Sequence, residues 1–583
     1  MIGVRSSAIR QAELAARPSA VNVAATDNLG RSLAVLSASE IFGPNFDYVR
    51  MSEREAVAAT MASLTALQSR VIGSAHGFAP RLAFRDELGR ANVRLARTYD
   101  GVPIFGSEVV THLGQDGTVR DVTSGTLPND LSLDTKPRMS EDSSMVTAVS
   151  AFAAIPERTH GPSLVVVKLD DGEFRLAHYI ALSAFADGKP RRTHYFVDAH
   201  SGELLPLTFS DRTWARHEQA TRQVSEARNQ GIAATRTGRD VPAEGTGNSI
   251  FSGNVPLTTT RDGDGYVLRD PTHNDAETRD AHNGAGGSGS RNTVFTDNDN
   301  RWAGPGDDAR VRDAVDAQYA AVQYLKYLRE IFGRNSLDDR GKRLLSNVHV
   351  YNNYANAFWD GETMNYGDGD GGENLSQTDS DTGGHEATHG LTDATSRLIY
   401  RGESGALNEA GSDVIGAAGF NWFLRGARGA GVLRDYLLFE DSYTPNIPDD
   451  AIRYMNDPTK DKSSRDNYRT RYTGSADNGG VHWNSGIANN FFYLLAEGGV
   501  NRTSQARVVQ GLGMEKALRI YYRAHNVYFT PDTTFQAARI GWLKAATDLF
   551  GVDSVEVRTV AEAADAVGIP GPARPPTDAP LFA

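Results

Sequence analysis

The stretch GGHEATHGLTDATSRLIYRGESGALNEAGSD, residues 383–413, carries two histidines, His385 and His389, four positions apart. Side chains at i and i+4 of a helix lie on one face about 5–6 Å apart, so two imidazoles at this spacing can bind one tetrahedral ion. Glu386 is rotated by roughly 100° around the same helix, where it misses the ion but can reach a water molecule on it. The alternative interpretation is a surface helix with scattered polar groups.

A carboxylate pair twenty residues further on favours the metal-site interpretation. Glu409 and Asp413 are also four positions apart, so on a second helix one can complete the site while the other accepts a hydrogen bond from a ligand imidazole. Two histidines and one carboxylate leave a fourth position open, which is typical of a catalytic zinc ion. A structural zinc site would need a fourth protein ligand, and the chain has no cysteine to supply it.

The composition limits the classes of function. The chain has 583 residues, of which 39% are hydrophobic, enough for about three or four domains. A formal net charge of -13 argues against nucleic acid as a partner, and the lack of cysteine excludes disulfides and thiolate ligands. There is no apolar run of about 18 residues and no signal-peptide core at the N-terminus. We therefore expect no membrane partner, and either residence inside the cell or the loss of a leader.

The order of sequence patterns predicts several domains. Residues 47–73 have apolar positions at helical spacing, and residues 93–127 and 174–206 alternate apolar and polar residues as strands do. These patterns predict two small α+β modules. Residues 211–245 are polar and lack apolar periodicity, so we interpret them as an exposed linker. Residues 307–333 predict a long helix, and the chain is mostly helical after residue 383.

Four motifs in the same order resemble the thermolysin family of zinc metalloproteases, most closely its secreted, vibriolysin- and pseudolysin-like neutral proteases. HEATH and NEAGSD are similar to the zinc-binding motifs of that family. YANAFWDGETMNYGDGDG (residues 354–371) resembles its substrate-binding edge strand, and SADNGGVHWNSGIANN (475–490) resembles the loop with its catalytic histidine. The resemblance covers nearly the whole chain beyond residue 90. It implies an α+β fold, in which a two-module α+β propeptide precedes a catalytic domain with a β-rich N-terminal lobe and a helical C-terminal lobe.

The resemblance also gives domain boundaries. We expect an N-terminal extension in residues 1–40, a first propeptide module of the fungalysin/thermolysin type in 41–130 and a second, PepSY-like module in 131–210. RTYDGVPIFGSEVVTHLGQDGTV and THYFVDAHSGEL carry the likeness to these two modules. A linker with the maturation site is expected in 211–245, the catalytic N-terminal lobe in 246–384, the zinc helix and helical lobe in 385–569, and a flexible tail in 570–583.

Roles for the chemical groups follow from the same resemblance. His385, His389 and Glu409 would bind zinc, and Glu386 would be the general base that deprotonates a zinc-activated water molecule. Tyr400 and His482 match the donors that stabilise negative charge on the attacked carbonyl oxygen, and Asp477 would hold His482 in position.

Further residues match positions that support the chemistry. Asn408 and Asp413 match the groups that orient the two ligand histidines. Asn356 and Ala357 match the edge-strand residues that bind an extended substrate backbone. Arg453 matches the arginine that grips the carbonyl beside the cleaved bond.

Calcium sites are implied by the resemblance, with departures from the family pattern. Asp381, Asp435 and Glu440 are in place near the zinc helix, but Phe420 and Leu437 stand where the family has further acidic ligands. We therefore expect at most one calcium ion there. Two other loops are each similar to a family calcium loop or are empty acidic turns, and their candidate ligands are Asp297 and Asp299, and Tyr443, Thr444, Ile447 and Asp450.

Two aspartate-rich stretches, RDGDGYVL (261–268) and GDGDGGENL (367–375), do not fit an EF-hand, because neither has a glutamate at position twelve. We interpret both as hairpin turns. The family favours an apolar residue after the cleaved bond, whereas Thr382 and Ser442 make this region more polar here. A broadened or reduced preference is the expectation.

Together these features predict a zinc-dependent endopeptidase with calcium as a second cofactor, made as a self-processing precursor and secreted as a monomer. Proteins and peptides would be its substrates, cut on the N-terminal side of hydrophobic residues, and its own propeptide would act as inhibitor and folding aid. The maturation cut is expected in residues 211–245, at Gly231–Ile232, because an apolar residue follows that bond. The alternatives are a catalytically silent zinc-binding protein of the same fold and a zinc hydrolase acting on non-peptide amides.

Overall fold

The computed structural model describes residues 51–67, 75–114, 117–124, 131–186, 189–211, 241–288, 291–426 and 436–571. Several expectations lie outside the described residues: the N-terminal extension in residues 1–40, the Gly231–Ile232 bond, the calcium candidate Asp435 and most of the tail in 570–583. Among the described residues, no helix combines the length and the apolar character that crossing a membrane requires.

The first N-terminal module packs a helix against antiparallel strands. Helix α3 (Glu53–Leu67) lies beside β1 (His76–Arg85), β2 (Ala91–Tyr99), β3 (Val102–Leu113) and β4 (Val119–Ser124). Apolar helix positions such as Ala56 and Leu64 form one buried cluster with Val93 and Leu95, which alternate along β2. The helical and alternating patterns of the sequence therefore meet in one small core.

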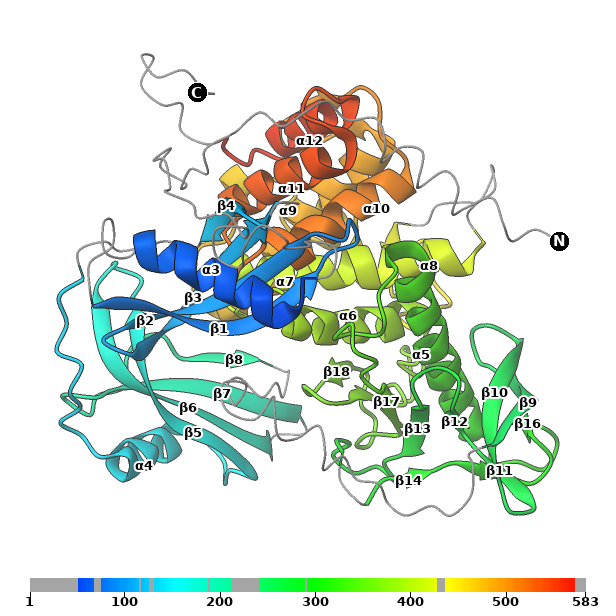
Figure 1. Cartoon of the computed structure of the whole chain (residues 1–583). Coiled ribbons are helices and arrows are strands. Elements are labelled where there is room, and N and C mark those ends of the chain that lie inside the picture. Colours follow the sequence, from blue (N-terminus) through cyan, green and yellow to red (C-terminus); the bar gives the residue numbers. More distant parts are fainter. Residues whose placement is uncertain are drawn as a thin grey trace.

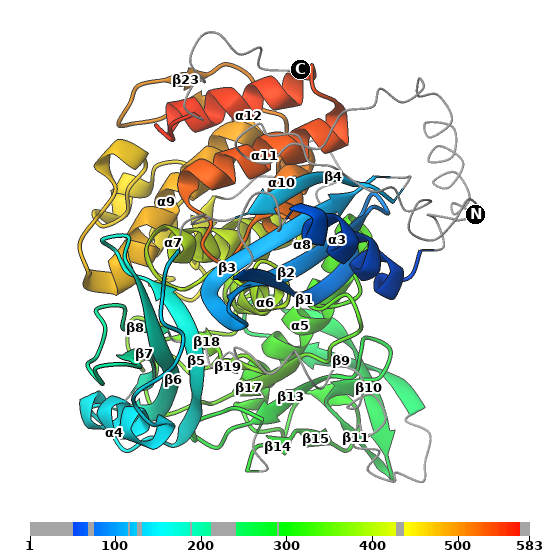
Figure 2. The same cartoon turned by 60° about the vertical axis from the view of Figure 1, so that its left-hand side comes forward.

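The second module continues the same sheet. Helix α4 (Glu141–Ala151) packs on β5 (Arg158–Lys168), β6 (Phe174–Ala186) and β7 (Lys189–Asp198), and the short β8 (Phe209–Asp211) ends the sheet. Strand β3 pairs in parallel with β5 at Ile104 and Val166, so the order β1-β2-β3-β5-β6-β7-β8 runs through both modules, with β4 on β3. This sheet lies beside the rest of the chain (Figures 1 and 2).

Residues 241–366 form a β-rich lobe of two sheets. The first contains β9 (Val241–Asn248), β10 (Asn254–Asp262), β11 (Gly265–Val267), β15 (Thr296–Asp297) and β16 (Arg301–Trp302). The second contains β12 (Arg269–Asp270), β13 (Ala276–Asp280), β14 (Thr293–Val294), β17 (Leu345–Val348), β18 (Ala357–Trp359) and β19 (Met364–Tyr366), and β18 ends its strand order. Helix α5 (Val311–Phe332) contacts both sheets.

Strand β9 corrects one expected boundary. Residues 241–245, placed in the linker by their sequence, already pair with β10, so the β-rich lobe begins at Val241 rather than at residue 246. Most side chains of β9 are exposed, which explains why the sequence shows no apolar alternation there. The strand is held by main-chain pairing. Gly247 lets it lie close to its neighbours, because a Cβ at this position would lie 2.6 Å from Val315 and 2.8 Å from Leu257.

One of the two hairpin predictions is wrong. RDGDGYVL does form a hairpin, in which Asp262 pairs with Gly265 across the β10–β11 turn. GDGDGGENL does not, because β19 ends at Tyr366 and the next regular element starts at Ser380. Asp370 instead closes a loop, accepting hydrogen bonds from the backbone N–H groups of Gly372 at 2.8 Å and Asn374 at 3.0 Å.

The C-terminal lobe is helical. Its helices are α6 (Ser380–Ala394), α7 (Gly402–Gly411) continuing through the π-helical η4 (Ser412–Ala418) into α8 (Gly419–Leu424), α9 (Ala476–Glu497), α10 (Met514–Arg523) continuing into the π-helical η7 (Ala524–Tyr528), α11 (Phe535–Phe550) and α12 (Val555–Ala566). Short elements complete the lobe: β20 (Leu437–Leu438), β21 (Arg453–Tyr454), β22 (Gly499–Val500), β23 (Arg507–Val508), η5 (Pro458–Asp461) and η6 (Tyr468–Thr470). One hydrophobic core continues through both lobes.

Helix α6 lies at the centre of this core, and glycine lets it approach its neighbour closely. Every residue from Asp381 to Thr392 is buried, and Asp379 caps the helix by accepting a hydrogen bond from the backbone N–H of Thr382 at 3.0 Å. A Cβ on Gly384 would lie 1.8 Å from the carbonyl oxygen of Gly416 in η4. The two backbones therefore meet at a distance that no other residue permits.

The first module is anchored to the helical lobe by buried ion pairs. Arg523 of α10 lies 2.8 Å from carboxylate oxygens of Asp86 and Glu87 in the β1–β2 turn and of Asp548 on α11. Burial opposes the charged form of Asp548, but Arg523 and Arg90 lower its pKa to about 2. Asp548 therefore stays ionised at neutral pH, and the ion pairs of Arg523 hold the turn against the lobe.

The second module contacts two other segments of the helical lobe. Asp170 pairs with Arg401 at 2.5 Å, and the backbone N–H of Ser210 in β8 donates to Asn478 Oδ1 at 3.1 Å. Ile399 packs against the hydrophobic cluster of this module. Both N-terminal modules thus contact the same lobe at separate places.

Replacing Gly384 by alanine is expected to lower the free energy of unfolding by about 2 kcal/mol or more, because overpacking outweighs the roughly 1 kcal/mol that alanine gains over glycine in a helix. Guanidinium unfolding followed by tryptophan fluorescence measures this change. Gly372→Ala is the matched control, since its Cβ would meet only Asp370 Oδ1, at 3.5 Å. Equal unfolding midpoints for the two variants would contradict the packing argument.

Candidate metal centre and active site

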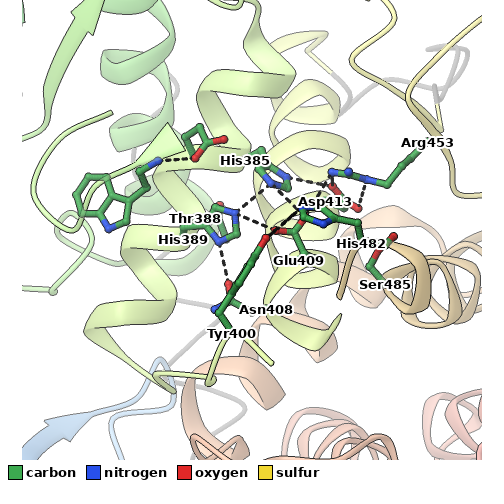
Figure 3. A network of polar contacts seen from close by, with 12 residues as sticks. His385, Thr388, His389, Tyr400, Asn408, Glu409, Asp413, Arg453, His482 and Ser485 are labelled. Atoms are coloured by element: carbon green, nitrogen blue, oxygen red, sulfur yellow. Dashed lines mark hydrogen bonds and ion pairs between the residues drawn. The ribbon is translucent and has the colours of Figure 1, made fainter. Parts of the chain in front are cut away.

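The two histidines of α6 point at one another from adjacent turns (Figure 3). Their Nε2 atoms are 3.1 Å apart, and both side chains are almost fully buried. The other ring nitrogens face oxygen atoms: His389 Nδ1 lies 2.8 Å from Asn408 Oδ1, and His385 Nδ1 lies 3.0 Å from Asp413 Oδ1. The tautomer with the proton on Nδ1, facing these acceptors, presents a lone pair at Nε2. Two lone pairs at this distance repel unless a cation lies between them.

Glu409 of α7 completes the cluster. Its carboxylate oxygens lie 3.7 Å from His385 Nε2 and 3.5 Å from His389 Nε2, and the three ligand atoms all lie within 4.8 Å of one another. Oε2 is buried and accepts no hydrogen bond among the described residues. Burial opposes ionisation, but His482, the two ligand histidines and Arg453 hold the pKa of Glu409 well below its usual range. Two imidazoles and one ionised carboxylate are a donor set that fits zinc.

Asp413 connects the metal cluster to a buried arginine. It is fully buried, and its oxygens accept hydrogen bonds from Arg453 Nε at 2.8 Å, Arg453 Nη2 at 2.6 Å and Asn489 Nδ2 at 2.8 Å. Arg453, expected from the sequence to grip substrate, lies 3.8 Å from Glu409 Oε2 and over the ring of Phe439 at 4.9 Å. The structure thus brings Arg453 beside the metal cluster, with two side-chain hydrogen bonds directed at Asp413.

Asn489 was missed in the sequence. It stands seven residues after His482 on α9, which is two helical turns on the same face, and that spacing was a usable signal. Asn408 could be predicted from the sequence, because it directly precedes Glu409. Its Nδ2 donates a hydrogen bond to the carbonyl oxygen of Leu398 at 3.0 Å, which fixes its Oδ1 toward His389. Both ligand rings are therefore oriented by buried partners.

Glu386 joins the metal helix to the edge strand. Its Oε2 accepts a hydrogen bond from the backbone N–H of Trp359 in β18 at 2.7 Å, and Trp359 Nε1 donates to Asp393 Oδ2 near the end of α6 at 2.9 Å. Ala357 begins this strand, and the carbonyl oxygen of Asn356 accepts from Gly367 at 3.1 Å. The candidate substrate-binding strand and the candidate base are thus fixed to each other.

Tyr400 and His482 lie on the other side of the cluster (Figure 3), and Asp477 extends this chain of contacts. Tyr400 donates a hydrogen bond to Glu409 Oε1 and lies 3.1 Å from His482 Nε2. Asp477 lies 2.6 Å from His482 Nδ1 and accepts a hydrogen bond from its backbone N–H at 2.8 Å. The residues from Asp477 to Gly480 all have positive φ, of 52°, 51°, 89° and 79°, which explains why DNGG precedes this histidine.

The first calcium candidate is a crowded acidic site. Burial and the charge of nearby Glu440 raise the pKa of Asp381 well above its usual value. Its oxygens accept hydrogen bonds from Asn421 and from the backbone N–H of Phe439. Phe420, in place of an acid, packs its ring on Tyr324 and Tyr327, and Leu437 lies in β20. Asp381 and Glu440 thus come together, while Asp435 lies outside the described residues.

The other two calcium candidates form turns closed by their own hydrogen bonds. Asp297 and Asp299 both accept from the backbone N–H of Arg301, at 3.0 and 2.9 Å. In the second loop, Asp450 accepts from Thr444 Oγ1 at 2.8 Å and from the Tyr454 hydroxyl at 3.0 Å. The backbone of this loop is closed by hydrogen bonds from Tyr443 to Phe439, from Ile447 to Thr444 and from Asp450 to Ile447. Calcium binding at these turns stays a prediction.

The two hydroxyls expected to make the specificity region polar are both buried. Thr382 Oγ1 donates to Asp379 Oδ2 at 2.8 Å, as part of the cap of α6. Ser442 is fully buried, and its carbonyl oxygen accepts from the backbone N–H of Leu375 at 2.9 Å. The Thr382 hydroxyl is therefore already used by the helix cap.

A second group with metal-binding side chains, Asp313, His349 and Asp368, was not found in the sequence, because its members are far apart in the chain. His349 Nδ1 lies 2.7 Å from Asp368 Oδ1, and Nε2 lies 3.0 Å from the carbonyl oxygen of Arg310. Both ring nitrogens already have protein partners. We therefore interpret this group as a hydrogen-bonded cluster within the β-rich lobe.

Comparison with known proteins agrees with this geometry. Residues 244–393 match the family described as thermolysin metallopeptidase, catalytic domain; residues 396–569 match thermolysin metallopeptidase, alpha-helical domain; and residues 77–125 match the fungalysin/thermolysin propeptide motif. Bacillolysin of Bacillus cereus is 38% identical over 490 residues, which cover 82% of each chain. Thermolysin of Alicyclobacillus acidocaldarius is 34% identical over 495 residues, covering 83% of this chain and 84% of its own.

Among solved structures, the precursor of protealysin from Serratia proteamaculans is similar at 29% identity and a TM-score of 0.42, covering 51% of this chain and 89% of its own. The family matches and the two relatives establish the assignment without it. The chain belongs to the thermolysin family of metallopeptidases, and its N-terminal part carries the propeptide motif of that family.

Proposed function

We propose that this metalloprotease is a zinc-dependent endopeptidase made as a self-processing precursor, which cleaves proteins and peptides on the N-terminal side of hydrophobic residues. The observation that carries the proposal is the convergence of His385, His389 and Glu409 at one buried point. Glu386 and the edge strand β18 lie on one side of that point, and Tyr400 and His482 lie on the other.

His385, His389 and Glu409 are the proposed zinc ligands. The chemistry that zinc supplies when bound there is Lewis acidity toward a substrate carbonyl and a water molecule. Asp413 and Asn408 hold the two rings by their Nδ1 atoms, so that both Nε2 atoms face the ion.

Glu386 is the proposed general base. Its carboxylate takes a proton from the attacking water and delivers it to the leaving amine. The hydrogen bond from the Trp359 backbone to Oε2, at 2.7 Å, keeps this carboxylate beside the strand that would carry the substrate. Base and substrate are then positioned by the same strand.

Tyr400 and His482 are the proposed donors to the developing oxyanion. Asp477 lies 2.6 Å from His482 Nδ1 and so orients the ring with Nε2 toward the site. An extended peptide would pair with β18 at Asn356 and Ala357, with Arg453 beside the scissile bond. Burial of the Thr382 hydroxyl in the helix cap supports an apolar preference for the residue after that bond.

The N-terminal modules are proposed to be the covalent inhibitor and folding aid of this enzyme. The family match identifies a propeptide motif in residues 77–125, and both modules contact the helical lobe. We further propose autolysis within residues 212–240, secretion, a monomeric mature form and at most one calcium ion near Asp381. Mass spectrometry of the processed protein tests the cleavage site.

Changing Glu386 to glutamine is expected to reduce casein hydrolysis by about 10²–10⁴-fold, because the amide cannot accept the proton. Zinc content, measured by mass spectrometry, is expected to stay at the parent level, and the variant precursor is expected to remain uncut. A chelator should remove the activity of the parent enzyme.

The control for this change is Glu562→Gln, an exposed carboxylate on α12. If the Glu386 variant kept its zinc and still digested casein, the proposed base would be wrong. If the zinc-loaded parent enzyme itself digested no casein, the alternative of a catalytically silent zinc-binding protein would stand instead.

Changing Asp413 to asparagine is expected to weaken zinc binding by about 10–100-fold, because His385 loses the charged partner that orients it. Competition with a chromophoric chelator measures the affinity. The folded state should also lose stability, on the order of 3–5 kcal/mol, since the buried charge of Arg453 loses the carboxylate that it hydrogen-bonds and keeps only the more distant Glu409. Asp553→Asn, at an exposed position, is the control. An unchanged zinc affinity would remove Asp413 from this role.

A further inference from the structure

Two arginines of the first N-terminal module pair with one carboxylate where this module contacts the helical lobe. Arg81 in β1 pairs with Glu108 Oε2 through Nε at 2.6 Å, and Arg94 in β2 pairs with Oε1 through Nη1 at 2.6 Å. Arg94 is fully buried, and the side chain of Glu108 is only 4% exposed. We name this group the arginine triad (Arg81, Glu108 and Arg94).

Three guanidinium hydrogen bonds of the triad reach carbonyl oxygens of the helical lobe. Arg81 Nη2 donates to Thr395 at 2.9 Å, the residue that caps the C-terminus of α6. Arg94 donates to Asn526 at 2.6 Å and to Phe529 at 2.9 Å, where the continuous helix α10–η7 ends. The last carbonyl groups of a helix have no partner within it, so the triad satisfies the ends of two helices.

The contact brings positive charge to two helix C-termini. Two guanidinium groups and one carboxylate carry a net charge of about +1, and each helix C-terminus carries roughly −0.5. Burial lowers the pKa of Arg94, and burial would raise that of Glu108, but Arg81 and Arg94 keep the pKa of Glu108 below its usual value. The triad remains charged, and its excess positive charge faces the two negative helix ends.

The two capped helices meet beside the metal centre. His525 of η7 lies 2.9 Å from Thr392 Oγ1 and 3.4 Å from Ser396 Oγ, at the end of the helix that carries His385 and His389. A Cβ on Gly411, at the end of α7, would lie 2.7 Å from the His525 ring. Strands β1–β3 lie over this region in Figure 2. The arginine triad therefore binds next to the point where α6 and α7, the helices that carry the three metal ligands, come together.

We propose that the arginine triad is the element by which the propeptide directs folding of the catalytic lobe: it caps α6 and α10–η7 together and fixes their crossing before the rest of the lobe packs. This inference rests on the proposed precursor function of the N-terminal modules. A contact that forms in the folding nucleus controls the folding rate, whereas a contact made only in the finished structure controls the unfolding rate.

The test uses refolding of the full chain in a Glu386→Gln background, so that no self-cleavage intervenes. Five of the six tryptophans lie in the two lobes and the sixth, Trp214, lies in the linker, so tryptophan fluorescence reports mainly on the lobes; a Trp214→Phe background removes the linker signal. Arg94→Gln and Arg81→Gln are expected to slow refolding by about tenfold or more in zinc-containing buffer, with unfolding rates changed by less than about twofold. Arg175→Gln, which removes an exposed ion pair with Glu173 inside the second module, should refold at the parent rate.

A triple variant, Arg81→Met, Glu108→Met and Arg94→Met, replaces the buried charges by apolar groups of similar size and so spares the fold of the module itself. It too should refold slowly, because it cannot cap the helices. Parent-like refolding of the triple variant, or faster unfolding with unchanged refolding, would overturn the proposal. Equal slowing by Arg175→Gln would overturn it as well. Refolding requires no protease activity, so a failure of the proposed enzyme function would appear separately, as a zinc-loaded parent protein that does not digest casein.

Discussion

The catalytic lobe depends on the compensation of buried negative charge. Glu409 and Asp413 lie one helical turn apart, both removed from water, and each ionised carboxylate would be costly there without positive partners. Arg453 compensates Asp413 directly, while the two imidazoles turn their lone pairs toward the same point as Glu409. A divalent cation at that point reconciles all of these groups. The chemistry and the packing of α6 and α7 therefore have a common electrostatic origin.

The edge strand and the metal helix form one unit. Trp359 bonds to α6 twice, through its backbone to Glu386 and through its ring nitrogen to Asp393. The close approach of α6 to η4 at Gly384 and Gly416 fixes the opposite side of the same helix. A displacement of α6 would thus move the candidate base, the ligands and the substrate strand together. Such coupling suits a site in which an error of about 1 Å costs much of the rate.

The central residues of the site could be predicted from their local spacing in the sequence. Features that depend on pairing between distant segments could not be predicted. His385, Glu386 and His389 follow from the helical repeat, and the DNGG turn before His482 is visible as residues that tolerate positive φ. The sequence does not reveal the pairing of β3 with β5 at Ile104 and Val166, which joins the modules, nor strand β9, which is held by main-chain bonds without an apolar stripe. Asp313, His349 and Asp368 come together only in the folded chain. The hairpin predicted at GDGDGGENL fails because no second strand follows it.

The continuous sheet of the two N-terminal modules has a consequence for how they leave the enzyme. The first module holds the lobe through Asp86 and Glu87, which pair with Arg523. The second module holds it through Asp170 and Ser210, which bond to Arg401 and Asn478. Because one sheet carries both contacts, the two modules behave as a bivalent ligand of the lobe. When one contact dissociates, the other keeps the dissociated module at a high effective concentration for rebinding. Cutting the connecting chain alone would then leave avidity intact, and release of the modules from the lobe would require digestion of the sheet itself.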